Sequence, residues 1–387
     1  MRQPLIFELS SSGHRFDYAA KLAKGLVDAG YRPILATSAE SADSSPFEVH
    51  FAGLSGKIDV ADVLDRSREL TTFGQAADVL TRTLEQFRPI RAYVSYGDGL
   101  MQTVSLRGLR GQRTIPADVP AEVLTMRATY AYPVPWSRRV RAIAGLTLLR
   151  SCCPWSRVHH LDALGFEVAC RGRGRFARVS RQIPEPVEPR QRLSRQQARD
   201  ELGWPEDRKL VVCAGGLDRR KGVHLLIEAF DSIQGDVDNS ALALVGRVAE
   251  DLRPAVDGLK QRLGDRLILL NRYVGNDEFL ASIAAADLVA VPYPRHVGSS
   301  GLLVRAAAAG RPILASDWGW VGWATRTHRL GTTCDVTNRN AFAAALRQAL
   351  EAAPSHVSSP EADAFVAYHS EQNFIEHWLR GIREDRY

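Results

Sequence analysis

Short apolar runs alternate with segments of helical apolar spacing along most of this chain. In the first half, apolar runs of strand length cover Leu5 to Leu9, Pro33 to Thr37 and Ala92 to Tyr96, and helices are expected over Phe16 to Val27 and about Ala61 to Gln86. In the second half, the strand-like runs are Leu210 to Ala214, Ala241 to Gly246 and Leu267 to Asn271, with helices over Gly222 to Phe230, Asp251 to Leu263 and Asp277 to Ala285. Because strands that alternate with helices pair in parallel, the pattern predicts two doubly wound α/β domains.

The stretch from Asp287 to Asp317 is the clearest single unit. It predicts a strand over Leu288 to Val291, a loop, a helix over Leu302 to Ala309 and a strand over Ile313 to Ser316. The loop contains Gly298, Ser299, Ser300 and Gly301, and it leads from the end of a strand to the start of a helix. Free backbone N–H groups, hydroxyls and the helix dipole at such a place suit a phosphate group. On their own, four such residues more often form only a strand-to-helix turn.

A proline-rich segment separates the two halves. Ile183 to Pro189 cannot form regular structure, and a short helix is expected over Arg195 to Leu202. We therefore expect an N-terminal domain over 1–182, a linker with its helix over 183–206, a C-terminal domain over 207–364 and an amphipathic C-terminal helix over 365–387. The apolar residues of that last helix include Phe365, Phe374 and Trp378.

Composition narrows the function. A chain of 387 residues with 45% hydrophobic and 24% charged residues is long enough for two cores. A formal charge of +6 suits an anionic small molecule or an anionic membrane surface, and the absence of dense basic patches argues against a nucleic-acid partner. No apolar run has the length of a membrane span and the start has no signal-peptide pattern, so a cytoplasmic protein is expected. The five cysteines form no CxxC pair and are expected to be reduced.

The segment of about 136–150 has two interpretations. Trp136, Val140 and Ile143 can share one helical face beside several arginines, among them Arg139 and Arg141. Such a helix can lie on anionic lipid, which would place the protein peripherally at the inner membrane face. The alternative is an ordinary helix that covers the sheet.

A cluster of cations follows the first strand of the second half. Arg219, Arg220 and Lys221 come after Gly215 and Gly216 and directly before a helix. A diphosphate held by a glycine-serine loop needs such a charge from a neighbouring loop. The other interpretation is a solvated turn.

These two segments together indicate a family. The runs GGLDRRKGVHLLIEAF and LVAVPYPRHVGSSGLLVRAAAAGRPILASDWG resemble the C-terminal domain of family 4 retaining glycosyltransferases of GT-B fold. The start, SSSGHRFDYAAKLAKGLVDAGYRPILAT, and the linker are similar to theirs as well. The resemblance implies two Rossmann-like doubly wound domains facing across a cleft. It also implies a nucleotide-diphosphate sugar as co-substrate, a carbohydrate or lipid-linked acceptor, transfer with retention, and no metal or other cofactor.

The resemblance also implies roles for individual residues. Lys221, assisted by Arg220, would stabilise the departing phosphate, and His14 and Asp98 are the catalytic candidates of the first domain. The residues expected to bind the donor are Gly13, Gly216, Arg219, Tyr273, Val274, Gly298, Ser299, Ser300, Gly301 and Arg305. Tyr273 and Val274 correspond to the strand end where the family seats the base.

The sequence departs from the family at two carboxylates. The positions of the family's paired glutamates carry Val297 and Arg305, and an arginine cannot accept hydrogen bonds from ribose hydroxyls. This departure favours an alternative function, a catalytically silent GT-B protein that binds a partner enzyme or a glycan. A GT-B epimerase is a third hypothesis, for which the sequence shows few suitable carboxylates and histidines.

Two further sequence patterns suggest a binding site, but each also has an ordinary structural explanation. Asp236 and Asp238 have the spacing of a metal-binding DxD motif but lie in a polar segment before a strand. Trp318, Trp320 and Trp323 could stack on a sugar or pack between domains.

Overall fold

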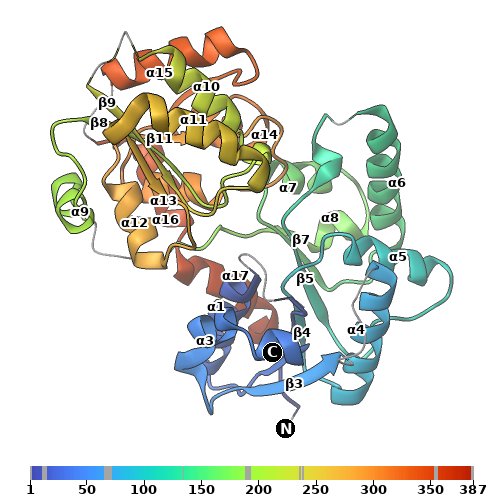
Figure 1. Ribbon diagram of the computed structural model, residues 1–387. Helices are drawn as coiled ribbons and strands as arrows, with labels where there is room; N and C mark the ends of the chain where they lie inside the picture. The colour runs from blue at the N-terminus through green and yellow to red at the C-terminus, as the bar shows by residue number, and fades with distance from the viewer. Residues whose placement is uncertain are drawn as a thin grey trace. The chain divides into compact units, whose positions relative to one another are not determined.

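The chain consists of two compact units, each built on one parallel sheet (Figure 1). The computed structural model describes residues 2–10, 15–64, 72–133, 135–187, 193–234, 237, 239–352 and 356–384. Unit 1 comprises Met1–Pro186 and Glu371–Tyr387, and unit 2 comprises Val187–Ser370. Helices cover the faces of both sheets, so the predicted pair of Rossmann-like α/β domains is confirmed.

The sheet of unit 1 has seven parallel strands in the order β3-β2-β1-β4-β5-β6-β7. Its short central strands are buried on both sides, as expected for a sheet covered by helices. The strands are β1 Leu5–Phe7, β2 Ile34–Ser38, β3 Asp59–Leu64, β4 Ala92–Val94, β5 Ala121–Thr125, β6 Arg157–His160 and β7 Ser180–Gln182.

The helices of unit 1 form two layers around this sheet (Figure 1). Apolar residues of α1, α3 and α17 pack in one buried cluster, and those of α4, α5, α6 and α8 pack in another. The helices are α1 Arg15–Asp28, α2 Ala39–Ala42, α3 Ser45–Phe51, α4 Phe73–Phe87, α5 Leu100–Leu109, α6 Trp136–Cys152, α7 Ala163–Cys170, α8 Arg175–Val179 and α17 Glu371–Glu384, with 3₁₀ turns Ala52–Leu54 and Thr129–Ala131.

The helix expected over Ala61 to Gln86 is wrong in its first part. Residues Asp59–Leu64 form β3, which pairs with β2 and alternates between more and less buried positions. This period of two is the signal of a half-exposed edge strand, and the longer helical pattern that follows it in the sequence concealed it. The helix itself is α4, which begins after Thr72, where Thr72 and Gln75 form a capping box.

The C-terminal segment forms two helices in place of the single one expected over 365–387. α16 Pro360–Tyr368 carries Phe365 and belongs to unit 2, whereas α17 carries Phe374 and Trp378 and belongs to unit 1. The chain leaves the helical conformation at His369, which caps the end of α16. The apolar pattern continues across this break, so periodicity alone does not reveal it.

α17 packs closely on the sheet and on α1. A Cβ atom added at Gly25 of α1 would lie 2.3 Å from Ile375, and Trp378 meets the ring of Tyr93 edge to face at 5.6 Å. Under the helix, the buried Glu122 carboxylate accepts hydrogen bonds from Arg91 at 2.5 Å and from His159 at 2.7 Å. The C-terminal helix is therefore an integral part of the core of unit 1.

The sheet of unit 2 has six parallel strands in the order β10-β9-β8-β11-β12-β13. α10, α11 and α15 cover one face, and α9, α12, α13 and α16 lie on the other (Figure 1). The strands are β8 Lys209–Ala214, β9 Ser240–Val245, β10 Leu267–Leu270, β11 Leu288–Val291, β12 Ile313–Ser316 and β13 Gly331–Cys334. The helices are α9 Arg195–Leu202, α10 Val223–Ser232, α11 Arg253–Leu263, α12 Asn276–Ala284, α13 Gly301–Ala308, α14 Gly319–Thr327, α15 Arg339–Ala352 and α16, with 3₁₀ turns Arg219–Lys221, Glu250–Leu252 and Gly264–Arg266.

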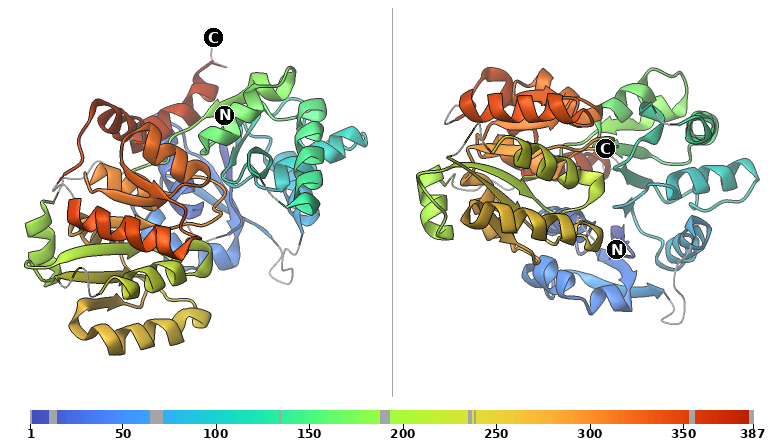
Figure 2. Two further views of the ribbon diagram at one scale, coloured as in Figure 1. Left: turned by 90° about the horizontal axis from the view of Figure 1, so that it is seen from above. Right: turned by 45° about the horizontal axis from the view of Figure 1, so that its top comes forward.

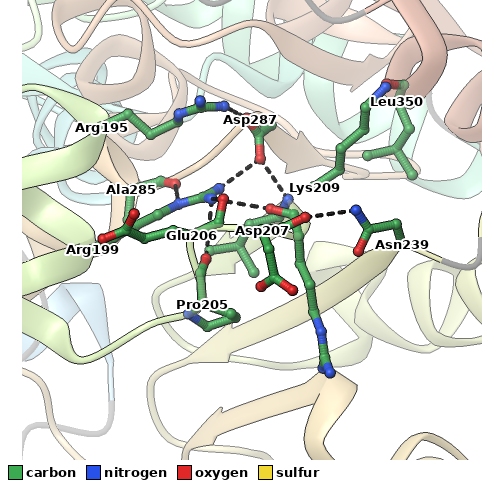
Figure 3. Close-up of polar contacts among 12 residues, drawn as sticks. Arg195, Arg199, Pro205, Glu206, Asp207, Lys209, Asn239, Ala285, Asp287 and Leu350 are labelled. Atoms are coloured by element: carbon green, nitrogen blue, oxygen red, sulfur yellow. Dashed lines mark hydrogen bonds and ion pairs between the residues drawn. The ribbon is translucent and has the colours of Figure 1, made fainter.

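A buried arginine fastens α9 to the amino edge of this sheet (Figure 3). The Arg199 side chain is 1% exposed, and its Nη2 donates to the Asp287 carboxylate at 2.6 Å. Asp287 also accepts from the backbone N–H of Leu210 at 2.7 Å, at the start of β8. The remaining donors of Arg199 bond to four backbone carbonyls, those of Ala285, Pro205, Glu206 and Arg208. The guanidinium thus satisfies a group of carbonyls that would otherwise be buried without partners.

None of the helices in the described residues combines the length and the apolarity that a bilayer-spanning helix requires.

Replacing Arg199 by Met should lower the free energy of unfolding of unit 2 by about 3–5 kcal/mol, because it leaves buried carbonyls and the Asp287 carboxylate without their main partner. Urea unfolding followed by circular dichroism measures the change. The matched control is Arg195→Met, since the Arg195 side chain also pairs with Asp287 but is 42% exposed. That control should cost at most about 1 kcal/mol. Equal losses in the two variants would contradict the role assigned to Arg199.

Candidate functional site

The strand order of unit 2 reverses at β8. Successive strands β9 and β10 are added on one side of β8, and β11, β12 and β13 on the other. In such a sheet the loops after the two strands at the reversal diverge and leave a crevice at the carboxyl edge, where ligands bind. The Lys221 loop follows β8, and the loop with Ser299 and Ser300 follows β11, which pairs directly with β8. The two loops predicted to share a phosphate therefore leave adjacent strands.

Two glycines determine the course of the loop after β8. Gly215 has φ +107°, and a Cβ atom there would lie 2.6 Å from Lys221 Nζ. Gly222 has φ +70°, and its Cβ would lie 1.9 Å from the carbonyl oxygen of Pro292 in the segment after β11. Both conformations favour glycine. At Gly222 the Pro292 backbone leaves no room for a side chain, whereas at Gly215 a Cβ atom would displace the Lys221 ammonium. The loop consequently presses against its neighbour and holds the Lys221 ammonium over the backbone of Gly215.

The three cations of this loop differ in their partners. Arg219 pairs with Asp251 at 2.7 Å, and Arg220 pairs with Asp218 at 3.3 Å. Within the residues that the structure describes, Lys221 Nζ has no carboxylate within 4.0 Å, and its nearest ring is Tyr293, with Nζ 5.8 Å from the centroid. Lys221 is thus the cation of the three whose charge is left for a ligand.

Asp218 orients the end of this loop. Its side chain accepts a hydrogen bond from the backbone N–H of Lys221 at 2.8 Å and so caps the turn Arg219–Lys221. It also pairs with Arg220. Asp218 was not among the predicted site residues, although an aspartate directly before a helical turn is a recognisable capping signal.

A histidine links the two loops. Arg220 Nη1 lies 3.4 Å from His296 Nδ1, and His296 Nε2 lies 3.0 Å from the carbonyl oxygen of Ser299. Since a carbonyl only accepts, His296 donates from Nε2 and its Nδ1 can accept from Arg220. This arrangement, which the sequence did not indicate, connects the cation cluster to the serine loop.

Ser300 starts α13 as its N-cap. Its Oγ accepts from the backbone N–H of Leu303 at 3.3 Å, and its side chain is buried. Gly298 has φ +107°, so the turn into the helix again requires glycine. Gly301 is the first helical residue and Ser299 is half-buried. N–H groups at a helix start lack partners within the helix, and α13 follows the strand that pairs with β8, so the two loops lie at the same edge of the sheet.

The other predicted donor residues lie around the carboxyl edge of unit 2. Gly216 is exposed and has open space around it, and Tyr273, after β10, is 77% exposed. Val274 is half-buried just before α12. Arg305 bends back along α13, where its Nη1 donates to the Gly301 carbonyl at 3.3 Å.

Val297 and three tryptophans are the remaining positions of unit 2 that the sequence singled out. Val297 is half-buried beside Gly298, in the position where the resemblance places a carboxylate. Trp320 is fully buried and packs on Phe365 and His369 within unit 2, so it is a core residue of that unit. Trp318 and Trp323 are half-buried.

In unit 1, Asp98 lies at the carboxyl end of β4. Burial raises the pKa of its carboxyl, and its Oδ1 accepts from Thr125 Oγ1 at 2.9 Å and from the N–H groups of Met126 and Arg127 at 3.0 and 3.2 Å. These bonds hold the segment after β5. Asp98 thus stabilises the fold of unit 1, and its catalytic role stays a prediction. Gly13 and His14 lie outside the described residues.

A second acidic residue of unit 1 was missed. Glu8 directly follows β1 and is 3% exposed. Burial raises the pKa of its carboxyl to about 7 against the opposing effect of Arg15, whose Nη1 is 3.9 Å away. A charged residue at the end of an apolar strand was the available signal, because such positions open onto the ligand edge of a parallel sheet.

Asp236 and Asp238 lie outside the described residues. Among those that are described, no three His, Cys, Asp or Glu side chains are grouped so that they could hold a metal ion.

Comparison with known proteins extends the resemblance. Residues 208–352 match the family model of glycosyl transferases group 1. Glycogen synthase of Mycobacterium tuberculosis is 31% identical over 146 residues, which cover 36% of this chain and 34% of the relative. A GDP-mannose-dependent alpha-(1-6)-phosphatidylinositol monomannoside mannosyltransferase of Mycolicibacterium smegmatis is 29% identical over 150 residues, which cover 36% of this chain and 38% of the relative. The chain thus spans about a third of the length of these curated relatives.

The likeness in three dimensions covers both units. The structure of HepE of Anabaena in complex with UDP and glucose matches with a TM-score of 0.70 at 15% identity, covering 99% of this chain and 100% of that one. At this identity the match concerns the fold alone. The expected resemblance to glycosyltransferases of GT-B fold is confirmed by the family model and by this fold.

Replacing Gly222 by Ala should disrupt the site region, because the new methyl group would meet the Pro292 carbonyl and the positive φ would be strained. We expect a loss of about 2–4 kcal/mol in the free energy of unfolding. Gly216→Ala is the matched control, since nothing lies within 4 Å of the added Cβ. Thermal unfolding of both variants tests this, and an unchanged melting temperature for Gly222→Ala would refute the close approach of the two loops.

Proposed function

We propose that this chain, whose residues 208–352 match the family model of glycosyl transferases group 1, is a glycosyltransferase that moves a sugar from a nucleotide diphosphate to an acceptor hydroxyl. In this proposal unit 2 binds the donor and unit 1 binds a carbohydrate or lipid-linked acceptor. Transfer proceeds with retention at the anomeric carbon. No metal ion or other cofactor takes part.

The observation that carries the proposal is that the Lys221 ammonium has no carboxylate partner among the described residues and lies in the loop after β8, the strand next to the one whose loop leads to α13. Arg219 and Arg220 are already paired with carboxylates, whereas Lys221 has none among the described residues. A diphosphate in the crevice would receive hydrogen bonds from Lys221 and from the N–H groups after Ser300. These groups are in place before the reaction, so they can stabilise the charge that develops on the leaving phosphate.

The reaction requires few other groups. The bond between the anomeric carbon and the diphosphate oxygen breaks, and a bond from that carbon to the acceptor oxygen forms. The acceptor proton passes to the departing diphosphate, whose oxygens Lys221 and the loop stabilise. Arg220 supports this arrangement through His296, which bonds to the Ser299 carbonyl. Residues Gly216, Arg219, Tyr273, Val274, Gly298, Gly301 and Arg305 surround the donor in this proposal.

Two relatives suggest which nucleotides to test first. HepE was crystallised with UDP and glucose, and the mycobacterial mannosyltransferase is dependent on GDP-mannose. Uridine and guanosine donors therefore come before adenosine donors in a screen by thermal stabilisation, because a bound ligand raises the melting temperature.

A second candidate function rests on Arg305. This side chain only donates hydrogen bonds, and Val297 offers no polar group, so the ribose and the sugar lack the two carboxylates that the resemblance would supply. A GT-B protein that binds a glycan or a partner enzyme without catalysis fits this departure. Calorimetric titration with UDP-glucose and GDP-mannose, followed by an assay of donor hydrolysis, separates the two functions. Binding without any turnover would favour the silent protein.

Replacing Lys221 by Ala should reduce transfer or donor hydrolysis by at least about a hundredfold, because the leaving group loses a charge-assisted hydrogen bond in the transition state. The melting temperature should stay close to that of the unaltered protein, since the Lys221 side chain has no ion pair among the described residues. Arg262→Ala is the control and should retain most activity, because Arg262 of α11 is outside the predicted donor residues and is paired with Asp231 at 3.0 Å. Full turnover by Lys221→Ala would refute the assignment.

We also propose that α6 brings the protein to an anionic membrane surface. On this helix Trp136, Val140 and Ile143 are 76%, 53% and 55% exposed, and Leu109 on the neighbouring α5 is 61% exposed. The two helices lie side by side (Figure 2) and neither contains an acidic residue. Exposed apolar side chains with Arg139 and Arg141 beside them match a lipid surface of negative charge. The peripheral location at the inner membrane face follows from this proposal.

The double replacement Trp136→Ser and Ile143→Ser should weaken binding to vesicles of phosphatidylglycerol and phosphatidylcholine by at least about tenfold, because two buried apolar contacts with lipid are lost. Vesicle flotation measures the bound fraction. Val49→Ser is the control, since Val49 of α3 is 69% exposed but has no such arginines on its helix. Equal flotation of the double variant and the unaltered protein would exclude α6 as the contact.

A further inference from the structure

The sheet of unit 1 has its own reversal of strand order, and it brings an arginine and a tyrosine together. β1 pairs with β2 on one side and with β4 on the other. Tyr96 follows β4, and Arg15 begins α1, the helix after β1. The edge that suits ligands in a doubly wound sheet therefore carries both side chains.

The guanidinium of Arg15 has unused hydrogen-bonding capacity. Its Cζ lies 3.5 Å from the centroid of the Tyr96 ring, so one face of the group is stacked. The nearest carboxylate oxygen belongs to Glu8 at 3.9 Å, beyond hydrogen-bond distance, and 28% of the Arg15 side chain is exposed. Within the described part of the chain, Arg15 donates no hydrogen bond to another residue, although a guanidinium has five N–H donors.

Two hydrogen bonds fix the Glu8 carboxylate near Arg15. Ser95 Oγ donates to Glu8 Oε2 at 2.8 Å, and the backbone N–H of Ser10 donates to Oε1 at 3.0 Å. No cation of the described residues other than Arg15 lies within 4.0 Å of the Glu8 carboxylate. Burial is the largest effect on Glu8 and raises its pKa to about 7. Near neutral pH the carboxyl is therefore partly protonated and compensates the charge of Arg15 only in part.

We propose that Arg15, stacked on Tyr96, binds a phosphate group of the acceptor, and that Glu8 is the positioning residue that keeps Arg15 at this edge. The inference rests on the proposed function in one respect, namely that unit 1 binds the acceptor. It adds the chemical class of that acceptor: a molecule that carries a phosphate near the hydroxyl to be glycosylated.

The chemistry of the pair selects phosphate. A guanidinium presents two parallel N–H donors that match two phosphate oxygens, and stacking on Tyr96 fixes the plane in which these donors lie. The phosphate can belong to a free phosphorylated polyol or to the head group of a phospholipid. Both sources share the same anionic group, so the experiment contains an arm for each.

The first experiment compares the unaltered protein with Arg15→Gln. Glycerol phosphate is titrated by calorimetry as the free source, and vesicles of phosphatidylglycerol in phosphatidylcholine serve as the lipid source. In the flotation arm both proteins also carry Trp136→Ser and Ile143→Ser, so that α6 does not contribute to vesicle binding. Arg15→Gln should weaken binding of one of the two by at least about tenfold, because a charge-assisted pair of hydrogen bonds is lost. A loss in the calorimetric arm identifies a free phosphate, and a loss in the flotation arm identifies a head group. Unchanged binding in both arms would overturn the proposal.

A second experiment tests the role of Glu8 with inorganic sulfate, whose charge is constant between about pH 6 and about pH 8. As the pH rises through about 7, Glu8 ionises and offsets the charge of Arg15, so the affinity for sulfate should fall severalfold. Glu8→Gln keeps the size and the polar contacts of the side chain, and it should bind sulfate with the same affinity across this range. A purely structural role would leave the pH dependence in place, and that result would remove Glu8 from the proposal.

Lys221→Ala separates this inference from the proposed function. The variant should lose nucleotide binding yet keep the part of glycerol phosphate or sulfate binding that Arg15→Gln removes, and Arg15→Gln should keep nucleotide binding. Retained nucleotide binding by Lys221→Ala would count against the donor site alone. Loss of sulfate binding in Lys221→Ala, with none in Arg15→Gln, would overturn the site at Arg15.

Discussion

The reversal of strand order in each parallel sheet is the constraint on which the chemistry of this protein depends. All strands of a sheet end at one edge, and the connections on either side of β1 and of β8 run in opposite directions. Side chains that are distant in the sequence therefore meet at that edge without any long-range pairing of their own. In unit 2 the reversal joins the lysine loop to the serine loop, and the fit between Gly222 and the Pro292 carbonyl shows how closely they approach. In unit 1 it joins Arg15 to Tyr96.

Charge pairing then decides which groups remain for a ligand. Three consecutive residues, Arg219–Lys221, are cations, but the two arginines form ion pairs with nearby carboxylates. Arg15 faces a carboxylate whose burial favours its neutral form, so its charge too is only partly offset. In both units the available cation thus lies at the carboxyl edge, beside backbone or side-chain groups fixed by hydrogen bonds. Such groups need little rearrangement when an anion arrives, which is the condition for strong electrostatic stabilisation.

The polar groups away from this edge serve the fold. Arg199 and Asp287 satisfy each other and the nearby backbone at the amino edge of unit 2, and Glu122 does the same with Arg91 and His159 under α17. Their donors and acceptors are largely used within the protein, which distinguishes them from Lys221 and Arg15. The contrast supports a division of each unit into a structural face and a ligand edge.

The sequence by itself determined the fold class, most elements and the positions of the two loops of the proposed donor site. The strands Leu288–Val291 and Ile313–Ser316 and the helix Arg195–Leu202 occur where the pattern places them, because burial on both faces and helix caps leave a local signature. The edge strand β3 and the break between α16 and α17 were not predictable in this way, since neighbouring helical patterns run across them. Only the tertiary structure decided that Lys221 has no carboxylate partner in the described part of the chain, that Asp98 secures the segment after β5, and that Glu8, Arg15 and Tyr96 meet. Ion pairs, the burial of a side chain and the distance between two groups depend on loops that are far apart in the sequence. The pattern of apolar and polar residues along the chain does not reveal which loops meet.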